Sequence, residues 1–336
     1  MADRKEQALA AVKEKYAYRT TDTIDALITG TPDDDPIARQ YIPTPAELFT
    51  TPEENEDPIG DEAHSPIKGI IHRYPDRVLF KPANICAVYC RYCFRREKVG
   101  PGQDILNQQE RSAALDYIRS NKQIWEVIFS GGDPLILSPR QLSHIMQELE
   151  QIDHVKVIRF HTRIPIADPK RITPELLNAL DIKKTIYMPL HVNHARELTQ
   201  EVQNTLEDLR RAGIILLSQS VLLKGVNDNA QTLEDLYRKL VELGVKPYYL
   251  HHPDYAPGTS HFRLSIHEGQ EIVKELLGRL SGLCQPTYML DIPQGHGKIP
   301  LTPCYIKELE QGAYEVTNYE GATYSYPPTS PEKEKK

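Results

Sequence analysis

The chain has 336 residues, 40% of them hydrophobic, and a formal net charge of −7. This length is enough for one large α/β domain or two small ones. The negative net charge argues against a nucleic-acid partner, because proteins that bind nucleic-acid phosphates usually have a basic surface. No apolar run approaches the roughly 20 residues of a membrane span. The first 19 residues are charged throughout and lack the apolar stretch of a secretory signal, so we expect no membrane association and a cytoplasmic protein.

The two ends of the chain are predicted to differ from the middle. Residues 1–65 would form an N-terminal extension that opens with a helix over residues 5–19, where apolar residues recur at helical spacing. Residues 31–65 are acidic and rich in proline, which favours irregular wrapping or a partly ordered arm. Residues 301–336 would form a short C-terminal segment that ends, from Pro327 onward, in a disordered tail.

Residues 66–300 are predicted to form the main domain. Short β-branched or aromatic runs recur about every 30 residues, the length of a strand–helix unit. The predicted strands are residues 78–81, 126–129, 156–160, 185–190, 214–217, 248–250 and 287–291. The predicted helices are residues 141–151, 175–180, 197–211, 232–243 and 269–280. Successive strand–helix units predict an α/β fold with a parallel sheet, open or closed into a barrel.

Polar and ionisable residues follow most of the predicted strands. They lie in residues 130–133, 161–163, 191–194, 219–220, 251–254 and 291–298. In a parallel barrel the carboxyl ends of the strands form one mouth, where active sites lie. Loops are commonly polar, but the recurrence of His, Asp, Gln and Lys in these loops predicts one composite site.

Three of the five cysteines form a CxxxCxxC motif at Cys86, Cys90 and Cys93, directly after the first of these strands. Three thiolates on a short loop can bind three irons of a [4Fe-4S] cluster and leave the fourth iron open to a small molecule. A structural zinc site would need a fourth nearby ligand, and Cys284 and Cys304 are remote in the sequence. The spacing therefore favours a cluster over zinc, and reduced thiols over disulfides.

Basic residues gather beside this motif, at Arg91, Arg95, Arg96 and Lys98. Because the chain as a whole is acidic, a polymeric polyanion is a poor partner for them. We expect a small anionic ligand instead.

The CxxxCxxC motif, with an aromatic residue before its third cysteine, resembles the signature of the radical S-adenosylmethionine superfamily. Residues 131–134 resemble the glycine-rich motif that this superfamily uses for the methionine end of S-adenosylmethionine. From about residue 65 to 305 the chain is similar to the lysine 2,3-aminomutases. The matching motifs are residues 72–77, 86–96, 130–135, 161–163, 191–194, 219–228, 261–263 and 291–300.

This resemblance implies a partial (β/α)6-type parallel barrel and an isomerase that converts L-lysine into β-lysine by moving an amino group between neighbouring carbons. It implies three cofactors: a [4Fe-4S] cluster, S-adenosylmethionine and pyridoxal 5′-phosphate. It also implies an electron donor such as flavodoxin or ferredoxin, and a homo-oligomer.

Lys298 lies in a glycine-bearing turn beyond the last barrel strand and matches the lysine that binds pyridoxal phosphate covalently. Without the resemblance this signal would be weak, because most lysines near such turns are solvated. Arg73, Tyr74 and Arg77 match residues around the same cofactor, and guanidinium groups suit its phosphate.

The resemblance also implies which residues bind the substrate. Arg95 matches the arginine that pairs with the α-carboxylate of lysine, and Asp254 and Asp291 match two aspartates that hold its distal ammonium. A substrate without that cation would leave two carboxylates unpaired in a dry pocket. The residues that match the S-adenosylmethionine pocket are Ser130, Gly131, Gly132, Asp133, His191 and Gln219.

The chain departs from the family pattern in two places. Larger members have a C-terminal extension whose cysteines, with one more from the barrel, bind zinc between subunits. The tail here contains none of these cysteines, and the matching barrel position is Asn229, so we expect no zinc. Residues 251–253 also differ from the aromatic and cysteine residues usual before Asp254.

Several alternatives remain. Short relatives that act on lysine for elongation factor P modification look to lack the second aspartate, so Asp291 favours free lysine. A sister activity on arginine or glutamate is open, although glutamate would need a cation where Asp254 and Asp291 stand. The alternative from another class is a non-catalytic zinc-binding regulatory protein that uses the three motif cysteines.

Overall fold

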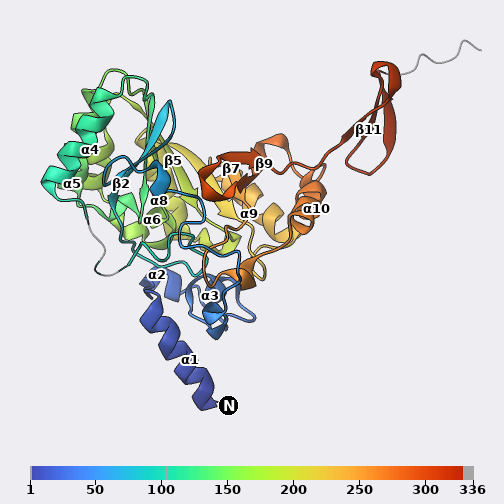
Figure 1. Ribbon diagram of the computed structural model, residues 1–336, viewed down its shortest axis with the longest axis horizontal. Helices are drawn as coiled ribbons and strands as arrows, with labels where there is room; N and C mark the ends of the chain where they lie inside the picture. Colours follow the sequence, from blue (N-terminus) through green and yellow to red (C-terminus); the bar gives the residue numbers. More distant parts are fainter. Residues whose placement is uncertain (1, 101, 103–104, 328–336) are drawn as a thin grey trace, which may run out of the picture.

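The computed structural model describes residues 2–100, 102 and 105–327. Its centre is a nine-stranded sheet in the order β1 to β9, with helices packed outside it (Figure 1). The strands are β1 (Ile70–Tyr74), β2 (Arg77–Ala83), β3 (Glu126–Gly131), β4 (Val157–Phe160), β5 (Thr185–His191), β6 (Ile215–Val221), β7 (Lys246–His251), β8 (Thr287–Asp291) and β9 (Lys298–Pro300).

Neighbouring strands from β2 to β8 pair in parallel, as the sequence predicts. β1 and β9 add antiparallel strands at the two edges, and among the described residues these edges do not pair with each other. The sheet is therefore a curled, partial barrel of the α/β class. The antiparallel edges were not predicted, because short strands carry little sequence signal.

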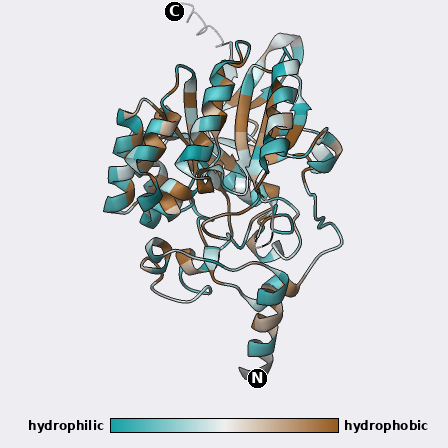
Figure 2. Cartoon of the chain, turned by 90° about the vertical axis from the view of Figure 1, so that its left-hand side faces the viewer, coloured by the Kyte–Doolittle hydropathy of each residue, from teal (hydrophilic) through white to brown (hydrophobic). Residues whose placement is uncertain are grey.

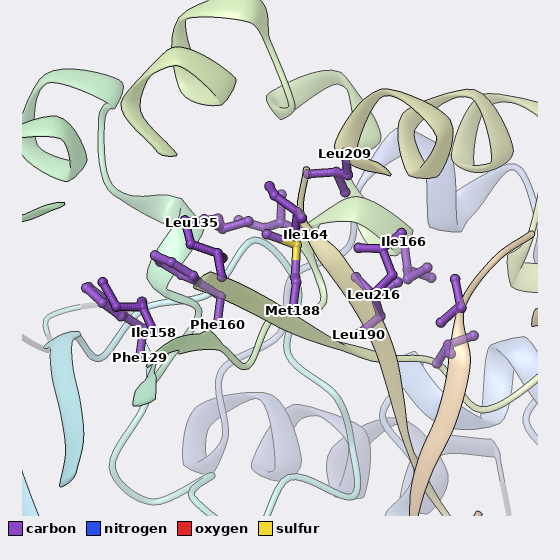
Figure 3. Close-up of a cluster of buried hydrophobic side chains, with 14 of the residues drawn as sticks. Phe129, Leu135, Ile158, Phe160, Ile164, Ile166, Met188, Leu190, Leu209 and Leu216 are labelled. Carbon is purple, nitrogen blue, oxygen red and sulfur yellow. The ribbon is translucent and has the colours of Figure 1, made fainter. Parts of the chain in front are cut away.

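The core lies between the sheet and its helices. Phe129 on β3 stacks on Phe160 on β4 with ring centroids 4.3 Å apart. Leu209 reaches this layer from a helix, and Met188 and Leu190 reach it from β5 (Figure 3). Apolar residues gather along the strands and polar residues along the outer helix faces (Figure 2). A parallel sheet covered in this way is expected to be rich in apolar residues along its strands.

The covering helices are α4 (Gln108–Ser120), α5 (Pro139–Glu150), α7 (Pro174–Leu180), α8 (Gln200–Arg211), α9 (Ala230–Glu242) and α10 (Ile266–Leu276), with a single-turn α6 (Ile164–Ala167) after β4. Side-chain caps fix several starts. Asn229 accepts a hydrogen bond from the backbone N–H of Thr232 at 2.9 Å and so caps α9. α8 begins later than predicted, because the carboxylate of Glu197 instead accepts the backbone N–H of Asn193 and of His194, both at 2.9 Å.

The N-terminal extension contains α1 (Ala2–Lys15), which starts and ends earlier than predicted, then α2 (Asp22–Asp25), α3 (Pro36–Tyr41) and the 3-10 turns η1 (Pro45–Leu48) and η2 (Glu62–His64). The acidic stretch is irregular, as expected, but it is anchored by buried carboxylates. Asp35, Glu47 and Asp61 are each no more than 3% exposed. We refer to residues 53–65 as the arm.

The C-terminal segment forms a second, three-stranded antiparallel sheet that the sequence did not predict. It consists of β10 (Ile306–Glu308), β11 (Tyr314–Thr317) and β12 (Thr323–Tyr326), and it stands away from the barrel in Figure 1. The predicted disordered tail falls almost wholly on residues 328–336, outside the described residues. The domain boundaries after residues 65 and 300 stay predictions. None of the described helices combines the length and apolar character needed to cross a membrane.

Candidate active site

The inside of the curled sheet contains a cavity of about 820 Å³. Inward-facing residues of the strands, the loop after β2 and the segment around Lys298 form its walls. All predicted site residues line it, namely Arg73, Tyr74, Arg77, Cys86, Cys90, Cys93, Arg95, Ser130, Gly131, Gly132, Asp133, His191, Gln219, Asp254, Asp291 and Lys298. The structure therefore brings together residues from both ends of the main domain.

The three motif cysteines lie on the loop after β2, and each is a free thiol. Burial raises the pKa of Cys93 to about 11 and the pKa of Cys86 well above its usual value, and nearby negative charge adds to both shifts. Cysteine binds metal as the thiolate, so cationic irons would supply the charge that this buried set lacks. The donor set fits a cluster.

Gly131 and Gly132 bring β3 against the chain just before the cysteines. Gly131 has a φ of +111°, and a Cβ atom there would lie 2.5 Å from the carbonyl oxygen of Ala83. A Cβ on Gly132 would lie 2.3 Å from the carbonyl oxygen of Ile85. Only glycine permits this approach. These residues thus brace the base of the cysteine loop as well as lining the cavity.

The carboxylate of Asp133 is occupied by protein donors. It accepts hydrogen bonds from the Thr162 hydroxyl at 2.7 Å and from the backbone N–H groups of Arg163 at 2.7 Å and Leu135 at 3.1 Å. Burial raises the pKa of Asp133 despite these bonds. Its side chain joins the ends of β3 and β4, so any contact with a ligand would be additional to that structural task.

Two of the basic residues expected to attract a small anion are instead bound to a buried carboxylate. Arg91 Nε lies 3.1 and 3.0 Å from the two carboxylate oxygens of Glu47, and Arg96 also donates to Glu47. The backbone N–H of Arg91 donates to the carbonyl of Gln40 at 2.8 Å. The expectation of an anion site at Arg91 and Arg96 was wrong, because the N-terminal extension supplies their counter-charge. These contacts hold the cysteine loop in place instead.

The other two basic residues of this cluster meet the arm. Arg95 donates from Nε to Asp61 Oδ2 at 2.8 Å and from Nη1 to the Ser130 hydroxyl at 3.2 Å. Lys98 Nζ lies 2.7 Å from a carboxylate oxygen of Glu62. Arg95 is the one of the four that also faces the cavity.

Lys298 begins the edge strand β9, and its side chain reaches into the cavity. Its ammonium contacts both carboxylate oxygens of Asp291, and its backbone N–H donates to the hydroxyl of Tyr74 at 3.2 Å. His251 Nδ1 lies 3.5 Å from Asp291 Oδ2. Burial alone would raise the pKa of Asp291, but the histidine and the ammonium lower it, so Asp291 is ionised.

Asp254 lies near this pair and forms no salt bridge with any of the described residues. Burial and the charge of Asp291 raise the pKa of Asp254 to about 7. Asp254 and Asp291, which the family resemblance assigned to one ligand, thus share one end of the cavity. Asp291 is ionised, whereas Asp254 changes its protonation state near neutral pH. An arriving cation would favour the ionised form of both.

Another part of the cavity wall is rich in arginine. Arg77 lies over the ring of Tyr74, 3.8 Å from its centroid, and Arg73 donates to the carbonyl of Ile59 at 2.5 Å. Arg159, which was not predicted, pairs with Glu126 at 3.0 Å. The buried Nε atoms of Arg73 and Arg159 have no hydrogen-bond partner among the described residues. Buried donors of this kind beside a cavity suit an anionic group such as a phosphate.

Imidazole groups line the middle of the cavity. Burial lowers the pKa of His191 to about 3 and the pKa of His161 well below its usual value, so both rings are neutral. Gln219 lies 3.4 Å from His161 through their Nε2 atoms. Neutral rings and an amide offer hydrogen bonds without adding charge to the site.

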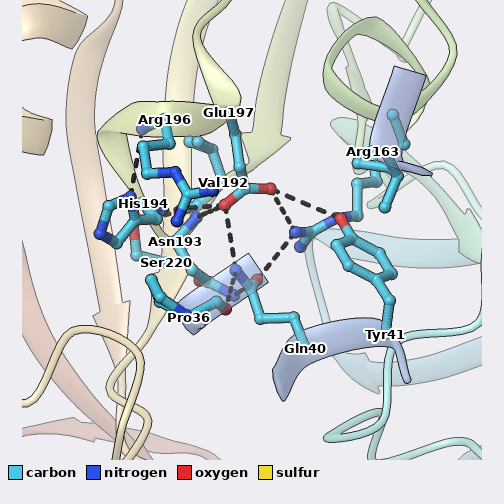
Figure 4. Close-up of polar contacts among 12 residues, drawn as sticks. Pro36, Gln40, Tyr41, Arg163, Val192, Asn193, His194, Arg196, Glu197 and Ser220 are labelled. Carbon is cyan, nitrogen blue, oxygen red and sulfur yellow. Dashed lines mark hydrogen bonds and ion pairs between the residues drawn. The ribbon is translucent and has the colours of Figure 1, made fainter. Parts of the chain in front are cut away.

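A buried polar network ties the N-terminal extension to the ends of the barrel strands (Figure 4). Arg163 Nη2 pairs with Glu197 at 2.5 Å and donates to the Gln40 side chain at 2.9 Å. Asn193 donates to the hydroxyl of Tyr92, the aromatic residue of the cysteine motif, at 2.7 Å. Helix α3, the ends of β4 and β5, and the cysteine loop are therefore fixed to one another.

Comparison with known proteins identifies the family. Residues 80–240 match the Radical SAM superfamily, and residues 273–335 match Lysine-2,3-aminomutase. The L-lysine 2,3-aminomutase of Clostridium subterminale is 38% identical over 324 residues, covering 96% of this chain and 78% of that protein. The enzyme of the same name from Methanococcus maripaludis is 42% identical over 292 residues, covering 87% and 67%. The chain belongs to the lysine 2,3-aminomutase family. It is a radical S-adenosylmethionine enzyme of the isomerase class that acts on a small molecule.

Membership of the lysine 2,3-aminomutase family implies a [4Fe-4S] cluster, S-adenosylmethionine and pyridoxal phosphate. The cavity fits this set, because it combines three free thiols, a lysine and two arginines whose buried Nε atoms have no hydrogen-bond partner in the described part of the chain. The family includes more than one substrate. The glutamate 2,3-aminomutase of Clostridioides difficile is 39% identical over 272 residues, covering 81% of this chain and 64% of that protein. Overall identity therefore does not decide which amino acid is bound.

Sequence reasoning missed several residues of this lysine 2,3-aminomutase site. Arg159 faces the cavity from the interior of β4, where no motif marks it. His251 lies among the polar residues expected after the strands, but the sequence did not indicate its contact with Asp291. Asp61 is only 3% exposed and pairs with Arg95. No local pattern marks it, because it lies among other acidic residues of the arm.

Proposed function

We propose that this enzyme is a 2,3-aminomutase that converts L-lysine into β-lysine by moving the amino group from the α-carbon to the β-carbon. The observation that supports it most strongly is the contact between the Lys298 ammonium and Asp291, beside Asp254. The side chain of Lys298 is the same chemical group as the distal end of the proposed substrate. A pocket that holds one lysine ammonium on a buried carboxylate offers the contacts that a second one needs.

Arg95 would hold the other end of the substrate. Its Nε and Nη1 groups have protein partners, and Nη2 makes no hydrogen bond among the described residues. An α-carboxylate that meets this guanidinium would gain a charge-assisted hydrogen bond. Free lysine would then be fixed at both ends, by an arginine at one and a carboxylate pair at the other.

The remaining assignments follow the cavity walls. Cys86, Cys90 and Cys93 would hold the cluster, with the S-adenosylmethionine pocket formed by the residues at the ends of β3, β5 and β6 that the sequence assigned. Lys298 would bind pyridoxal phosphate, and Arg73, Tyr74 and Arg77 would surround that cofactor.

When bound, the cluster and S-adenosylmethionine supply a hydrogen-abstracting radical, and pyridoxal phosphate carries the migrating amino group. The protein's own contribution is to bind, orient and shield. Neutral His191 and Gln219 line the space where a reactive species must not meet bulk water. Asp254 and Asp291 would fix the distal end of the substrate, so that its β-carbon takes a single position.

Glutamate fits this site less well than lysine. Its distal carboxylate would meet Asp254 and Asp291, and two or three negative charges would share one buried space. Arginine would present a cation, but a larger and planar one. We infer further that the reductant is a flavodoxin or ferredoxin and that the enzyme works in the cytoplasm as a homo-oligomer, all of which rest on the family relationship.

The test is anaerobic reconstitution with iron, sulfide, pyridoxal phosphate and S-adenosylmethionine, followed by parallel incubation with lysine, arginine, glutamate and elongation factor P. We expect β-lysine from lysine, and a brown protein with about four irons per chain. Turnover of glutamate or of elongation factor P in preference to lysine would overturn the proposal. A colourless protein that retains zinc would favour the regulatory alternative.

A further inference from the structure

Asp61 on the arm lies between two arginines of the cavity. Arg95 Nε donates to Asp61 Oδ2 at 2.8 Å, and Arg73 Nη2 lies 3.4 Å from Asp61 Oδ1. One of these arginines is assigned to the substrate carboxylate and the other to pyridoxal phosphate. A single carboxylate from outside the barrel therefore joins the two anion-binding groups of the site.

The arm holds Asp61 firmly. Its backbone N–H donates to Asp57 Oδ1 at 2.9 Å, and its carbonyl accepts from the Ser65 hydroxyl at 2.9 Å. The preceding Gly60 has a φ of +65°, and a Cβ atom there would lie 2.4 Å from the backbone of Gln294. The arm is thus packed against the turn that leads to Lys298, so Asp61 is positioned relative to both ends of the cavity.

The contact with Asp61 determines which edge of Arg95 remains available. A guanidinium group has five N–H donors in a rigid plane. Asp61 takes the Nε edge and Ser130 takes one Nη1 hydrogen, which leaves the end that carries Nη2. An incoming carboxylate would meet Arg95 at the remaining hydrogens of Nη1 and Nη2.

Asp61 also limits the positive charge of this wall. Burial alone would raise the pKa of Asp61, but the charge of Arg95 and of neighbouring cations lowers it, so the group is ionised. Its negative charge offsets part of the attraction that Arg95 and Arg73 exert on any anion. A substrate carboxylate bound to Arg95 would therefore lie close to a like charge.

We propose that Asp61 is a positioning residue for the substrate carboxylate, which fixes the direction of Arg95 at the cost of weaker binding. This inference rests on the proposed function, because it needs an amino acid whose carboxylate meets Arg95. A positioning role and a purely structural role of Asp61 lead to different results. Removing the charge of Asp61 should strengthen carboxylate binding while it slows the reaction.

The variant Asp61→Asn keeps the size of the side chain but removes its charge, so the ionic hydrogen bond from Arg95 Nε is replaced by a weaker, neutral one. The matched control is Glu56→Gln, which removes one negative charge from an exposed position on the same arm. Lysine and lysinamide are the two ligands, since lysinamide replaces the carboxylate with a neutral amide. Dissociation constants come from the absorbance change of bound pyridoxal phosphate under anaerobic conditions, and kcat comes from β-lysine formation.

For Asp61→Asn we expect the dissociation constant of lysine to fall about three- to tenfold, that of lysinamide to change less than about twofold, and kcat to fall about tenfold or more. Glu56→Gln should change none of these. A rise in both dissociation constants together would show a structural role and overturn the inference, as would an unchanged ratio between the two ligands. Thermal melting of Asp61→Asn, with Asp61→Ala as a second variant, identifies any loss of folding.

The results for the wild-type enzyme separate the two proposals. If the wild-type enzyme forms β-lysine and the ratio of dissociation constants does not move in Asp61→Asn, only the role of Asp61 fails. If the wild-type enzyme neither binds nor converts lysine, the proposed function fails, and the inference fails with it.

Discussion

Replacing either carboxylate of the Asp254–Asp291 pair with asparagine should reduce the conversion of lysine and spare a substrate without a distal cation. In the resting structure Asp291 holds the ammonium of Lys298, and Asp254 lies beside it with a raised pKa of about 7. When Lys298 binds pyridoxal phosphate, both carboxylates become available to the substrate. Asparagine has nearly the same size as aspartate, so the barrel and the cluster should remain intact.

The size of the effect follows from the burial of the pair. Asp291 is only 7% exposed, so water cannot replace a lost partner of the substrate ammonium. A charge-assisted hydrogen bond in such a setting contributes about 1.5–3 kcal/mol. This corresponds to a loss of roughly ten- to more than a hundredfold in kcat/KM for lysine. Cleavage of S-adenosylmethionine without amino migration should survive, because the cysteine loop is untouched.

The assay is steady-state kinetics of Asp254→Asn and Asp291→Asn with lysine and with norleucine, which lacks the distal amine. Asp153→Asn is the matched control, because Asp153 is exposed and precedes β4 at the other end of the strands. The preference for lysine over norleucine should collapse in the first two variants and persist in the third. If both cavity variants convert lysine like the parent, the distal ammonium is bound elsewhere and free lysine loses its support as the substrate.

Three further predictions concern other parts of the site. Cys90→Ala should abolish formation of 5′-deoxyadenosine and lower the iron content, whereas Cys284→Ala should preserve both; full activity without Cys90 would contradict the cluster assignment. Lys298→Ala should lose the absorbance of bound pyridoxal phosphate but keep the cluster, and peptide mapping after borohydride reduction of the parent should find the pyridoxyl group on Lys298 and on no other lysine. Because binding of the ammonium needs ionised Asp254, kcat/KM for lysine should rise as pH increases through about 7 and level off above it; the same rise in Asp254→Asn would assign it to another group.

The positions of the strands and the cysteine site could be predicted because their signals are local. A buried parallel strand needs a short run of β-branched or aromatic residues, and successive units repeat at the length of one strand and one helix. Three thiolates that bind one cluster must lie close together on the chain, so the spacing of Cys86, Cys90 and Cys93 carries the information by itself. Glycines at Gly131 and Gly132 are equally local, since each backbone approach excludes a Cβ atom at that residue.

The charge pairing of the site could not be predicted in this way. Arg91 and Arg96 resemble an anion site in the sequence, but both pair with the buried carboxylate of Glu47 from the N-terminal extension. The sequence of the arm did not indicate that Asp61 would be buried against Arg95. The arm contains several acidic residues, and no local pattern distinguishes the one that becomes buried.

The sequence by itself therefore determined the positions of the parallel strands, the cysteine loop and the residues that face the cavity from the strand ends. Only the tertiary structure decided which charges are free to meet a ligand, because that depends on which distant segments pack together. Asp291 illustrates the difference: its place at the end of β8 follows from the local pattern, but its ionised state depends on His251 and Lys298. Ionisation in a buried site is set by neighbours in space, and a linear sequence does not name them.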